Sequence, residues 1–374
     1  MKSVRRWASL PSSNSVHRTE RSPVTILVRR EDVNSKIKRT VVVLLLVGGT
    51  ATVGSAQEVT KIGTSAAKFL SIPVGARALG MGGAFVAVAN DASAMYWNPA
   101  GMTRIYQSEA LFTHSAWLAD INFNYGGVVL PVEGLGMVGL SFTSLSMDEM
   151  ERTTVDQPDG TGEFFSAGSF AIGASYARAL TDWFSIGGTV KYINERIWNS
   201  SATGLAVDLG TLFNTPFPGL RFGAGITNFG QKLQITGDDL LVQKDISPNA
   251  GNNANVNASL TTDPFNMPLT LRIGFAYEPI VTDDQQLILV VDAIHPNDNT
   301  ESISLGGEYS LFQRIVSFRG GYKSLGTRDS EEEFTLGGGL RYEVAAGLTV
   351  KFDYAFEQFG RLAEVHKFSI GVLF

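Results

Sequence analysis

The stretch 75–101, GARALGMGGAFVAVANDASAMYWNPAG, decides the fold of this chain. It is rich in glycine and alanine, nearly free of charge, and ends in Asn98-Pro99-Ala100-Gly101. Glycine gives the backbone conformational freedom, and small side chains let neighbouring segments approach closely. Pro99 fixes its own φ and favours an extended Asn98. These features predict a compact segment that packs inside a larger structure and ends in a tight turn.

The rest of the chain alternates between apolar and polar residues. The last strand is the clearest case, because one of its faces carries Phe368, Ile370, Val372 and Phe374. Its other face carries Lys367, Ser369 and Gly371. A strand between lipid and an aqueous lumen needs this period of two. We therefore predict an all-β fold, a 14-stranded antiparallel transmembrane β-barrel with an N-terminal plug segment.

The strand count and the connections support a membrane barrel. We predict an even number of strands, as single-chain bacterial barrels have, over 108–117, 121–131, 134–146, 163–180, 183–197, 202–214, 219–228, 269–279, 285–295, 301–312, 314–325, 333–345, 347–358 and 363–374. With the first strand running outward, even connections should be short and odd ones long. The pattern holds for most connections, and the short segment 118–120 breaks it. A soluble β-sandwich has no reason to show this parity.

Composition excludes several classes of protein. The chain has 374 residues, no cysteine and 18% charged residues, with a mean hydropathy of +0.07. It contains no run of 18 apolar residues, which excludes a helical membrane protein. The segment 1–56 holds 10 of the 30 basic and 3 of the 36 acidic residues, so the remainder carries 20 basic and 33 acidic residues, a net charge of −13. Such a surface repels nucleic acid, and we expect no nucleic-acid partner.

The N-terminal region has the features of an export signal. Basic residues at 36–39 precede the short apolar run 41–47, and small residues at 54–56 precede Gln57. This order predicts a signal peptide cleaved near Ala56/Gln57. We therefore divide the chain into an upstream extension plus signal peptide (1–56), an N-terminal plug (57–107) and a transmembrane barrel (108–374).

The sequence offers no site for catalysis, metal binding or a cofactor. Beyond the signal peptide the histidines are His114, His295 and His366, and none has the spacing of a metal-binding pair. There is no G-x-S-x-G elbow. The run at 80–83 lacks both the G-x-G-x-x-G spacing and the Gly-Lys-Ser/Thr ending of phosphate loops. We therefore expect a protein that is not an enzyme and needs no cofactor.

The plug motif followed by strands and a terminal phenylalanine resembles the FadL-like outer-membrane barrels, whose N-terminal plug ends in a similar NPAG turn. The resemblance covers about residues 62–374, and within these barrels the chain looks most like the PorV/PorQ family. This implies a protein of the outer membrane that contacts its lipid. The terminal Phe374 resembles the C-terminal signal read by the outer-membrane assembly machinery.

The resemblance implies two alternative functions. PorV-like proteins are components of the type IX secretion system: they bind the C-terminal signal domain of secreted clients and shuttle them from the translocon barrel to surface attachment. FadL-like transporters instead pass long-chain fatty acids or other hydrophobic solutes. In the first case we expect the loops 147–162 and 229–268 to bind the client, unless they are only solvated external loops. In the second, the plug turn near Asn98 would gate the ligand.

Within the plug we expect sealing or gating to depend on Gly80, Gly82, Gly83, Asp91, Asn98, Pro99 and Gly101. Sealing of the lumen and direct contact with a ligand both remain open roles. Basic residues inside strands should face the lumen, because a cation on the lipid face near the midplane costs roughly 2–4 kcal/mol; they are Arg178, Lys191, Arg221, Arg272, Arg319, Arg341 and Lys351. We expect aromatic residues near strand ends to form interfacial girdles: Trp117, Trp183, Trp198, Phe312 and Phe359.

Overall fold

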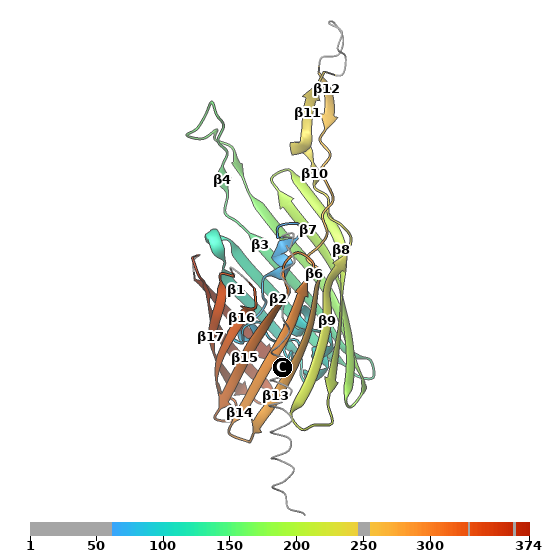
Figure 1. The fold of residues 1–374 in the computed structure, drawn as a ribbon, viewed down its shortest axis with the longest axis vertical. Helices are drawn as coiled ribbons and strands as arrows, with labels where there is room; N and C mark the ends of the chain where they lie inside the picture. Colours follow the sequence, from blue (N-terminus) through green and yellow to red (C-terminus); the bar gives the residue numbers. More distant parts are fainter. Residues whose placement is uncertain (1–61, 246–254, 328–329, 362–363) are drawn as a thin grey trace, which may run out of the picture. The chain divides into compact units, whose positions relative to one another are not determined.

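The computed structural model describes residues 62–245, 255–327, 330–361 and 364–374. The predicted upstream extension and signal peptide, and the first residues of the predicted plug, lie outside these residues. The described chain belongs to one compact unit, and its dominant element is a closed antiparallel β-barrel (Figure 1). The predicted fold, an all-β barrel of fourteen antiparallel strands, is confirmed.

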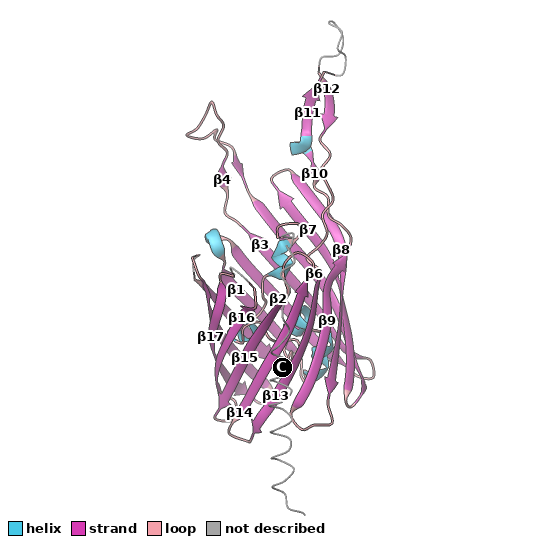
Figure 2. Ribbon diagram, viewed as in Figure 1, coloured by secondary structure: helices cyan, strands magenta, loops and turns pink. Residues whose placement is uncertain are grey.

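Fourteen strands form the wall (Figure 2). They are β1 (Glu109–Ala116), β2 (Asn122–Val132), β3 (Gly136–Ser146), β6 (Ala167–Thr181), β7 (Phe184–Ile197), β8 (Ser200–Asn214), β9 (Leu220–Gly230), β13 (Thr270–Val281), β14 (Gln286–Pro296), β15 (Ser302–Leu311), β16 (Val316–Leu325), β17 (Glu332–Ala345), β18 (Leu348–Phe359) and β19 (Val365–Leu373). Each strand pairs with its neighbours along the chain, and β1 pairs with β19 to close the wall. The first and last strands meet in a register that runs from Glu109 opposite Leu373 to Ala116 opposite His366.

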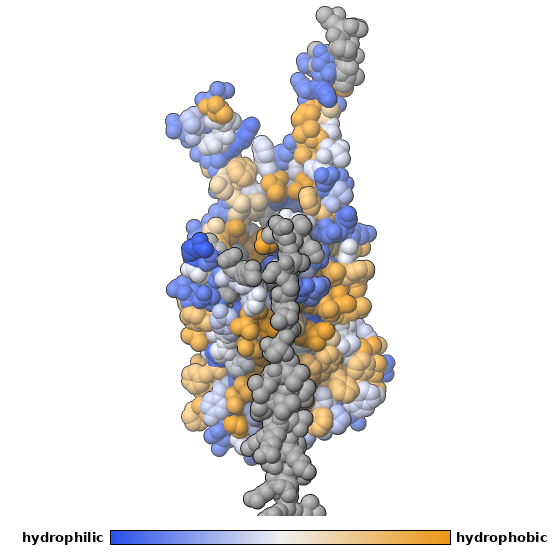
Figure 3. All heavy atoms as spheres, in the orientation of Figure 1, coloured by the Kyte–Doolittle hydropathy of each residue, from blue (hydrophilic) through white to orange (hydrophobic). Residues whose placement is uncertain are grey.

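The alternation of the strands separates the two faces of the wall. In β19 the residues Val365, Lys367 and Ser369 are buried towards the lumen, whereas Phe368 and Ile370 are about half exposed on the outside. Apolar side chains gather on the outer wall below the projecting loops (Figure 3). This is the arrangement that lipid on one side and a polar lumen on the other require.

The two rims of the barrel differ. One rim, here called the short-turn end, carries connections of two to five residues, such as 182–183 and 215–219. The other, here called the long-loop end, carries the connections 147–166 and 231–269 (Figure 1). The connection 117–121 is also at the long-loop end but is short, and it contains the 3-10 turn η4 (Leu118–Asp120). The two-residue connection 198–199 between β7 and β8 is short at this end as well. The predicted parity therefore holds for most connections, with 117–121 and 198–199 as exceptions.

Small elements lie in the two long connections. The first contains the two-residue strands β4 (Met150–Glu151) and β5 (Phe164–Phe165), which pair with each other. The second contains β10 (Thr236–Gly237), η5 (Asp238–Leu240), β11 (Leu241–Lys244) and β12 (Val256–Ser259). β11 and β12 form a hairpin that projects beyond the barrel (Figure 1).

A segment of short helical turns passes through the lumen before the first wall strand. It contains η2 (Lys68–Ser71), α2 (Ala76–Gly80), α3 (Ala94–Trp97) and η3 (Pro99–Arg104). α2 contacts β16, β17, β18 and β19, while η3 contacts β6, β7 and β8. Most of its residues are fully buried, so this segment and the inner wall make up the hydrophobic core. No helix among the described residues is long and apolar enough to cross a membrane.

The structure corrects two expectations about strand ends. Arg178 does not face the lumen: it lies on the outer face of β6 near the short-turn end, where a long side chain reaches the interface at little cost. Trp117 and Phe359 do not belong to an outer girdle. Their rings pack edge to face, 5.3 Å apart, with Phe359 only 5% exposed and Lys367 over Trp117. Trp183, Trp198 and Phe312 are exposed near strand ends, as expected.

Candidate functional site

Asn98 joins the lumenal segment to the wall. Its side-chain amide donates to the carbonyl oxygen of Val86 (2.8 Å) and to that of Thr211 on β8 (2.9 Å). Its side-chain oxygen accepts from the backbone N–H of Ala100 (3.2 Å). Asn98 is therefore the N-cap of η3, with Pro99 at the first helical position where no N–H is needed. Its side chain is fully buried and uses both its donor and acceptor groups.

Glycines on both sides let the segment contact the wall backbone to backbone. A Cβ at Gly82 would lie 2.6 Å from the carbonyl oxygen of Leu305, and the φ of Gly82 is +68°. A Cβ on the facing wall residue Gly321 would lie 2.6 Å from the Cα of Gly82. Similar backbone contacts recur around the wall at Gly187, Gly223, Gly306 and Gly337, whereas a Cβ at Gly210 or Gly274 would meet side chains of the segment or the wall. At these positions the inward glycine belt leaves no room for a side chain on the wall.

Polar wall side chains accept hydrogen bonds from backbone N–H groups of the segment. Asp292 on β14 accepts from the N–H groups of Phe85 (2.7 Å) and Val86 (3.0 Å). Ser369 on β19 accepts from Ala76 (2.9 Å), and Thr335 on β17 accepts from Gly82 (3.0 Å). Irregular backbone inside a closed barrel needs such partners, because an unpaired buried N–H costs free energy.

A buried ion-pair network links the segment to the wall on the side of α2. Arg77 donates two hydrogen bonds to Glu308 on β15, at 2.8 and 2.9 Å, and contacts Asp91 at 3.4 Å. Glu308 also accepts from Arg319 on β16 (2.6 Å), and Arg319 pairs with Asp353 on β18 (2.7 Å). We call these residues the Arg77 network. The two hydrogen bonds from the guanidinium of Arg77 to the carboxylate of Glu308 make it a charge-assisted contact of defined geometry.

Other lumenal cations of the predicted set also face inward. Lys191 pairs with Asp208 (2.8 Å), and Arg221 pairs with Glu278 (2.5 Å). Arg272 lies over the rings of Tyr96 and Trp97. Lys351 pairs with Glu109 (3.0 Å). The expectation of a charged lumen is therefore met by all the predicted cations except Arg178.

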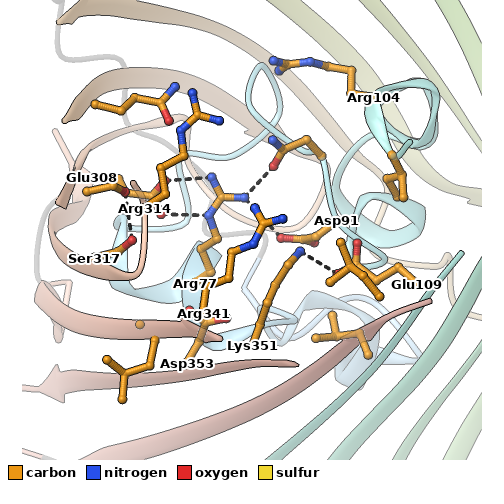
Figure 4. A pocket seen from close by; sticks show the side chains of 18 of the residues that line it. Arg77, Asp91, Arg104, Glu109, Glu308, Arg314, Ser317, Arg341, Lys351 and Asp353 are labelled. Atoms are coloured by element: carbon orange, nitrogen blue, oxygen red, sulfur yellow. Dashed lines mark hydrogen bonds and ion pairs between the residues drawn. The ribbon is translucent and has the colours of Figure 1, made fainter. Parts of the chain in front are cut away.

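A cavity of about 420 Å³ lies at the short-turn end, between the lumenal segment and strands β14 to β19 and β1 (Figure 4). We call it the basic cavity. Six cationic side chains line it: Arg77, Arg104, Arg314, Arg319, Arg341 and Lys351. Four carboxylates line it: Asp91, Glu109, Glu308 and Asp353. Burial, together with the nearby Arg221, lowers the pKa of Arg104 to about 10.

At the long-loop end the first described turn of the segment covers an apolar layer. We call residues 65–71 the cover. It is held by hydrogen bonds from the N–H of Ala66 to Asn266 (2.9 Å) and from that of Ala67 to Glu195 (2.9 Å), and by an ion pair of Lys68 with Asp298 (2.7 Å). Phe69 and Leu70 of the cover are part of this apolar layer, together with the buried side chains of Phe123, Ile193, Leu233 and Met267 and the partly buried Trp117 and Leu145.

The long connection 231–269 is fixed at its base. Leu233 and Phe265 exchange backbone hydrogen bonds of 2.8 and 2.9 Å, which closes the stem of the projecting hairpin. Asp239 accepts from the N–H of Asn199 and the hydroxyl of Ser200, each at 2.9 Å. Burial alone would raise the pKa of Asp239, but these hydrogen bonds outweigh it and the pKa is lowered.

The structure gathers the predicted plug residues in one segment, although their role in sealing or gating stays a prediction. Gly80 and Gly82 contact the wall, Gly83 has a φ of +69°, and Gly101 lies against Ala89. Asp91 accepts from the backbone of Ser93 (2.9 Å) besides contacting Arg77. Phe374 is half exposed, and its N–H donates to Ser108 (2.9 Å).

Sequence reasoning missed the wall's contribution. It did not name the glycine belt, and it expected Asp292 to pair with a lumenal cation rather than with the backbone of Phe85 and Val86. The facing of two distant segments leaves no local pattern in the sequence. Arg77 carried a usable signal: it is the one basic residue in the stretch 75–101, and a lone cation in a buried segment needs an acid. The cover and the apolar layer combine residues 65–71 with wall and loop residues that are far apart in the sequence.

Comparison with known proteins agrees with this fold. Residues 46–192 match the model of an uncharacterised protein family, UPF0164. No curated protein matches the chain by sequence. Among solved structures it is similar to the CymD monoaromatic hydrocarbon channel, with 16% identity, 80% of this chain and 96% of that chain covered, and a TM-score of 0.52.

Two toluene transporters are similar in the same way. TbuX from Ralstonia pickettii is 14% identical, with 80% of this chain and 97% of that chain covered and a TM-score of 0.52. TodX from Pseudomonas putida is 12% identical, with 80% and 96% covered and a TM-score of 0.51. At these identities the likeness concerns the fold, which is that of the FadL-like barrels.

Proposed function

We propose that this chain is an outer-membrane transporter of hydrophobic solutes. The observation that carries the proposal is the apolar layer at the long-loop end of the lumen, covered by a short segment held by a few polar contacts. An apolar solute gains free energy on leaving water for such a layer. The similarity of the fold to a monoaromatic hydrocarbon channel and two toluene transporters supports the same class of cargo. Outer-membrane barrels have long extracellular loops and short periplasmic turns. We therefore place the long-loop end at the cell exterior and the short-turn end in the periplasm.

The mechanism follows from the contacts of the cover. A solute reaches the apolar layer when residues 65–71 move away from Asn266, Glu195 and Asp298. These contacts are few, and the Lys68 side chain is 59% exposed in its ion pair, so they can break and re-form during transport. The gate is then the cover rather than the turn at Asn98, whose bonds are fully buried.

A reversible crosslink tests this mechanism. Ser65 and Asn266 form a β-bridge, so a disulfide between S65C and N266C suits the spacing, and the chain has no other cysteine. We expect the oxidised double variant to lose uptake of toluene or oleate by expressing cells, and reductant to restore it. The matched control is V242C/A258C, which crosslinks the paired strands of the projecting hairpin away from the cover. Full uptake by the locked double variant would refute the gating role.

The second candidate function is that of a PorV/PorQ-type component of the type IX secretion system. The projecting hairpin and the connection 147–166 favour it, because paired strands with free edges at the outer surface suit binding of a sheet-like client domain. The partners would then be the translocon barrel and the C-terminal domains of clients. Two further partners are expected under both proposals, namely outer-membrane lipid and the assembly machinery that reads Phe374.

Deleting residues 241–259 separates the two functions. The deletion removes the hairpin but keeps the Leu233–Phe265 pair that closes its stem. Under the secretion proposal, clients with a C-terminal signal domain accumulate inside the cell while solute uptake continues. Under the transporter proposal, secretion is unchanged. The exported form that we propose, with a signal peptide ending near Ala56/Gln57, is checked by the N-terminal sequence of the purified protein.

A further inference from the structure

The basic cavity at the short-turn end has more cations than the lumenal acids can pair. Among its lining residues, six are cationic and four are carboxylates, which leaves an excess of two positive charges. Arg77, Arg319 and Lys351 have carboxylate partners. No described carboxylate forms an ion pair with Arg104, Arg314 or Arg341.

These three arginines come from separate elements. Arg104 ends η3, Arg314 stands in the turn between β15 and β16, and Arg341 lies on β17. Figure 4 shows them around the cavity together with Lys351. Convergence of guanidinium groups from distant parts of the chain is costly for folding because like charges repel. A bound anion would relieve that cost.

Two observations show which cations of the basic cavity lack a negative partner. Arg341 lies directly opposite Lys351 in the register of β17 and β18, and like charges opposite each other destabilise a sheet. The Nη1 atom of Arg104 is buried and has no hydrogen-bond partner in the described part of the chain. A buried donor without an acceptor costs free energy, more so when it is charged.

The cavity is open to solvent at the short-turn rim. Tyr106 is 89% exposed, and Gln107 and Arg314 are exposed as well. An anion therefore has a path into the cavity that does not pass the cover or the apolar layer. Its volume of about 420 Å³ exceeds what one small ion needs, so a larger group attached to the anion also fits.

We propose that the basic cavity binds a phosphate group. A phosphate presents at least three acceptor oxygens and close to two negative charges, which match several guanidinium donors and the charge excess of the cavity. The source is either free phosphate or a phospholipid headgroup. This site is separate from the proposed transport of hydrophobic solutes and does not depend on it.

Titration calorimetry on the full chain in non-ionic detergent and phosphate-free buffer tests the site. The first probe is inorganic phosphate, and the second is dihexanoyl phosphatidic acid. We expect saturable binding that R104Q and R341Q each weaken about tenfold or more, because each removes a charge-assisted hydrogen-bond donor. The matched control is R178Q, which removes an arginine on the outer face near the same rim and should leave binding unchanged.

A further variant guards against unfolding. R341E places a carboxylate opposite Lys351, so it should fold with unchanged or higher thermal stability and yet fail to bind phosphate. Tighter binding of the lipid probe than of inorganic phosphate would assign the site to a headgroup, and equal binding would assign it to the free anion. Absence of saturable binding of both probes, or equal losses in R341Q and R178Q, would overturn the proposal.

Discussion

At the residue scale, Asn98 shows how one side chain connects two parts of the lumenal segment to a strand of the wall. Val86 and Thr211 offer carbonyl oxygens, Ala100 offers an N–H, and a single amide group binds all three. Only asparagine or glutamine carries both the donors and the acceptor, and the shorter side chain also fits an N-cap. This gives a physical reason for the asparagine of the Asn98–Gly101 turn.

Asn98→Ala should lower the free energy of unfolding by at least about 2 kcal/mol, because two buried carbonyl oxygens lose their donors. Urea unfolding in lipid vesicles, followed by tryptophan fluorescence, measures the loss. The control is Asn124→Ala, whose side chain meets His114 on the exposed outer wall. Its effect should stay within about 0.5 kcal/mol. Similar losses for both variants would contradict the role assigned to Asn98.

Gly321 and Gly320 are neighbours on β16 that point to opposite faces. A Cβ at Gly321 would collide with the backbone of Gly82, whereas a Cβ at Gly320 would meet only the end of Leu336 at 4.0 Å. Gly321→Ala should therefore cost roughly 1–3 kcal/mol of stability and raise ion leakage. Thermal unfolding and conductance in planar bilayers measure the two effects. Gly320→Ala should change neither, and a leak in this variant would remove the steric explanation.

At the element scale, the strands could be predicted from the sequence and the contacts of the lumenal segment could not. Residues of a wall strand alternate between lipid and lumen, so the alternation of apolar and polar residues predicts the bounds of each strand to within a few residues, as for β7 and β14. The pairing of the lumenal segment with the wall has no such period. Nothing local distinguishes Gly321 from Gly320, and only the position of Gly82 across the lumen does.

The errors at strand ends have the same origin. Depth in the membrane decides whether a charge or a ring must face inward, and the free-energy cost of an outward charge becomes small near the rims. Arg178 near one rim therefore faces outward at little cost, while Trp117 beyond the other rim turns inward onto Phe359. Only the height of a residue in the finished barrel settles such positions, and height depends on the stagger between strands.

The segment from β10 to η5 should be released by acid. Hydrogen bonds from Asn199 and Ser200 lower the pKa of Asp239, so the attachment is stable above the ordinary carboxyl range and is lost as the pH falls through the lowered pKa. Hydrogen exchange of residues 236–244 against pH measures the release. Asp239→Asn should lower the protection factors of these residues and remove the change of these factors with pH. Asp238→Asn is the control, and an acid transition that persists in Asp239→Asn would exclude this carboxylate.

At the scale of the whole molecule, the Arg77 network joins elements that are far apart in the sequence. It runs from α2 through β15 and β16 to β18, and every charge in it is largely buried. A buried network of this kind is strongly affected by the loss of one member, because the remaining charges cannot return to water. It therefore links the stability of the lumenal segment to that of the wall.

Arg77→Ala should lower the free energy of unfolding by about 3–5 kcal/mol, because Glu308 and Asp91 lose their shared partner. Arg361→Ala is the control: its ion pair with Glu331 is on the surface, with Arg361 88% exposed, and should contribute about 1 kcal/mol or less. Urea unfolding of both variants in the same vesicles compares them. Equal losses would mean that the network does not link the segment to the wall.

The contacts of the last strand impose an order on biogenesis. β19 closes the cylinder against β1, and it also binds the lumenal segment through Ser369 to Ala76 and through Lys367 to Pro73. Once the seam is shut, a folded segment this wide has no opening through which to enter. The interior must therefore be in place while the cylinder is still an open sheet, and the segment acts as an internal template on which the final strand docks. Chains in which the lumenal segment folds only after the barrel has closed would be trapped as barrels with an empty, leaky lumen.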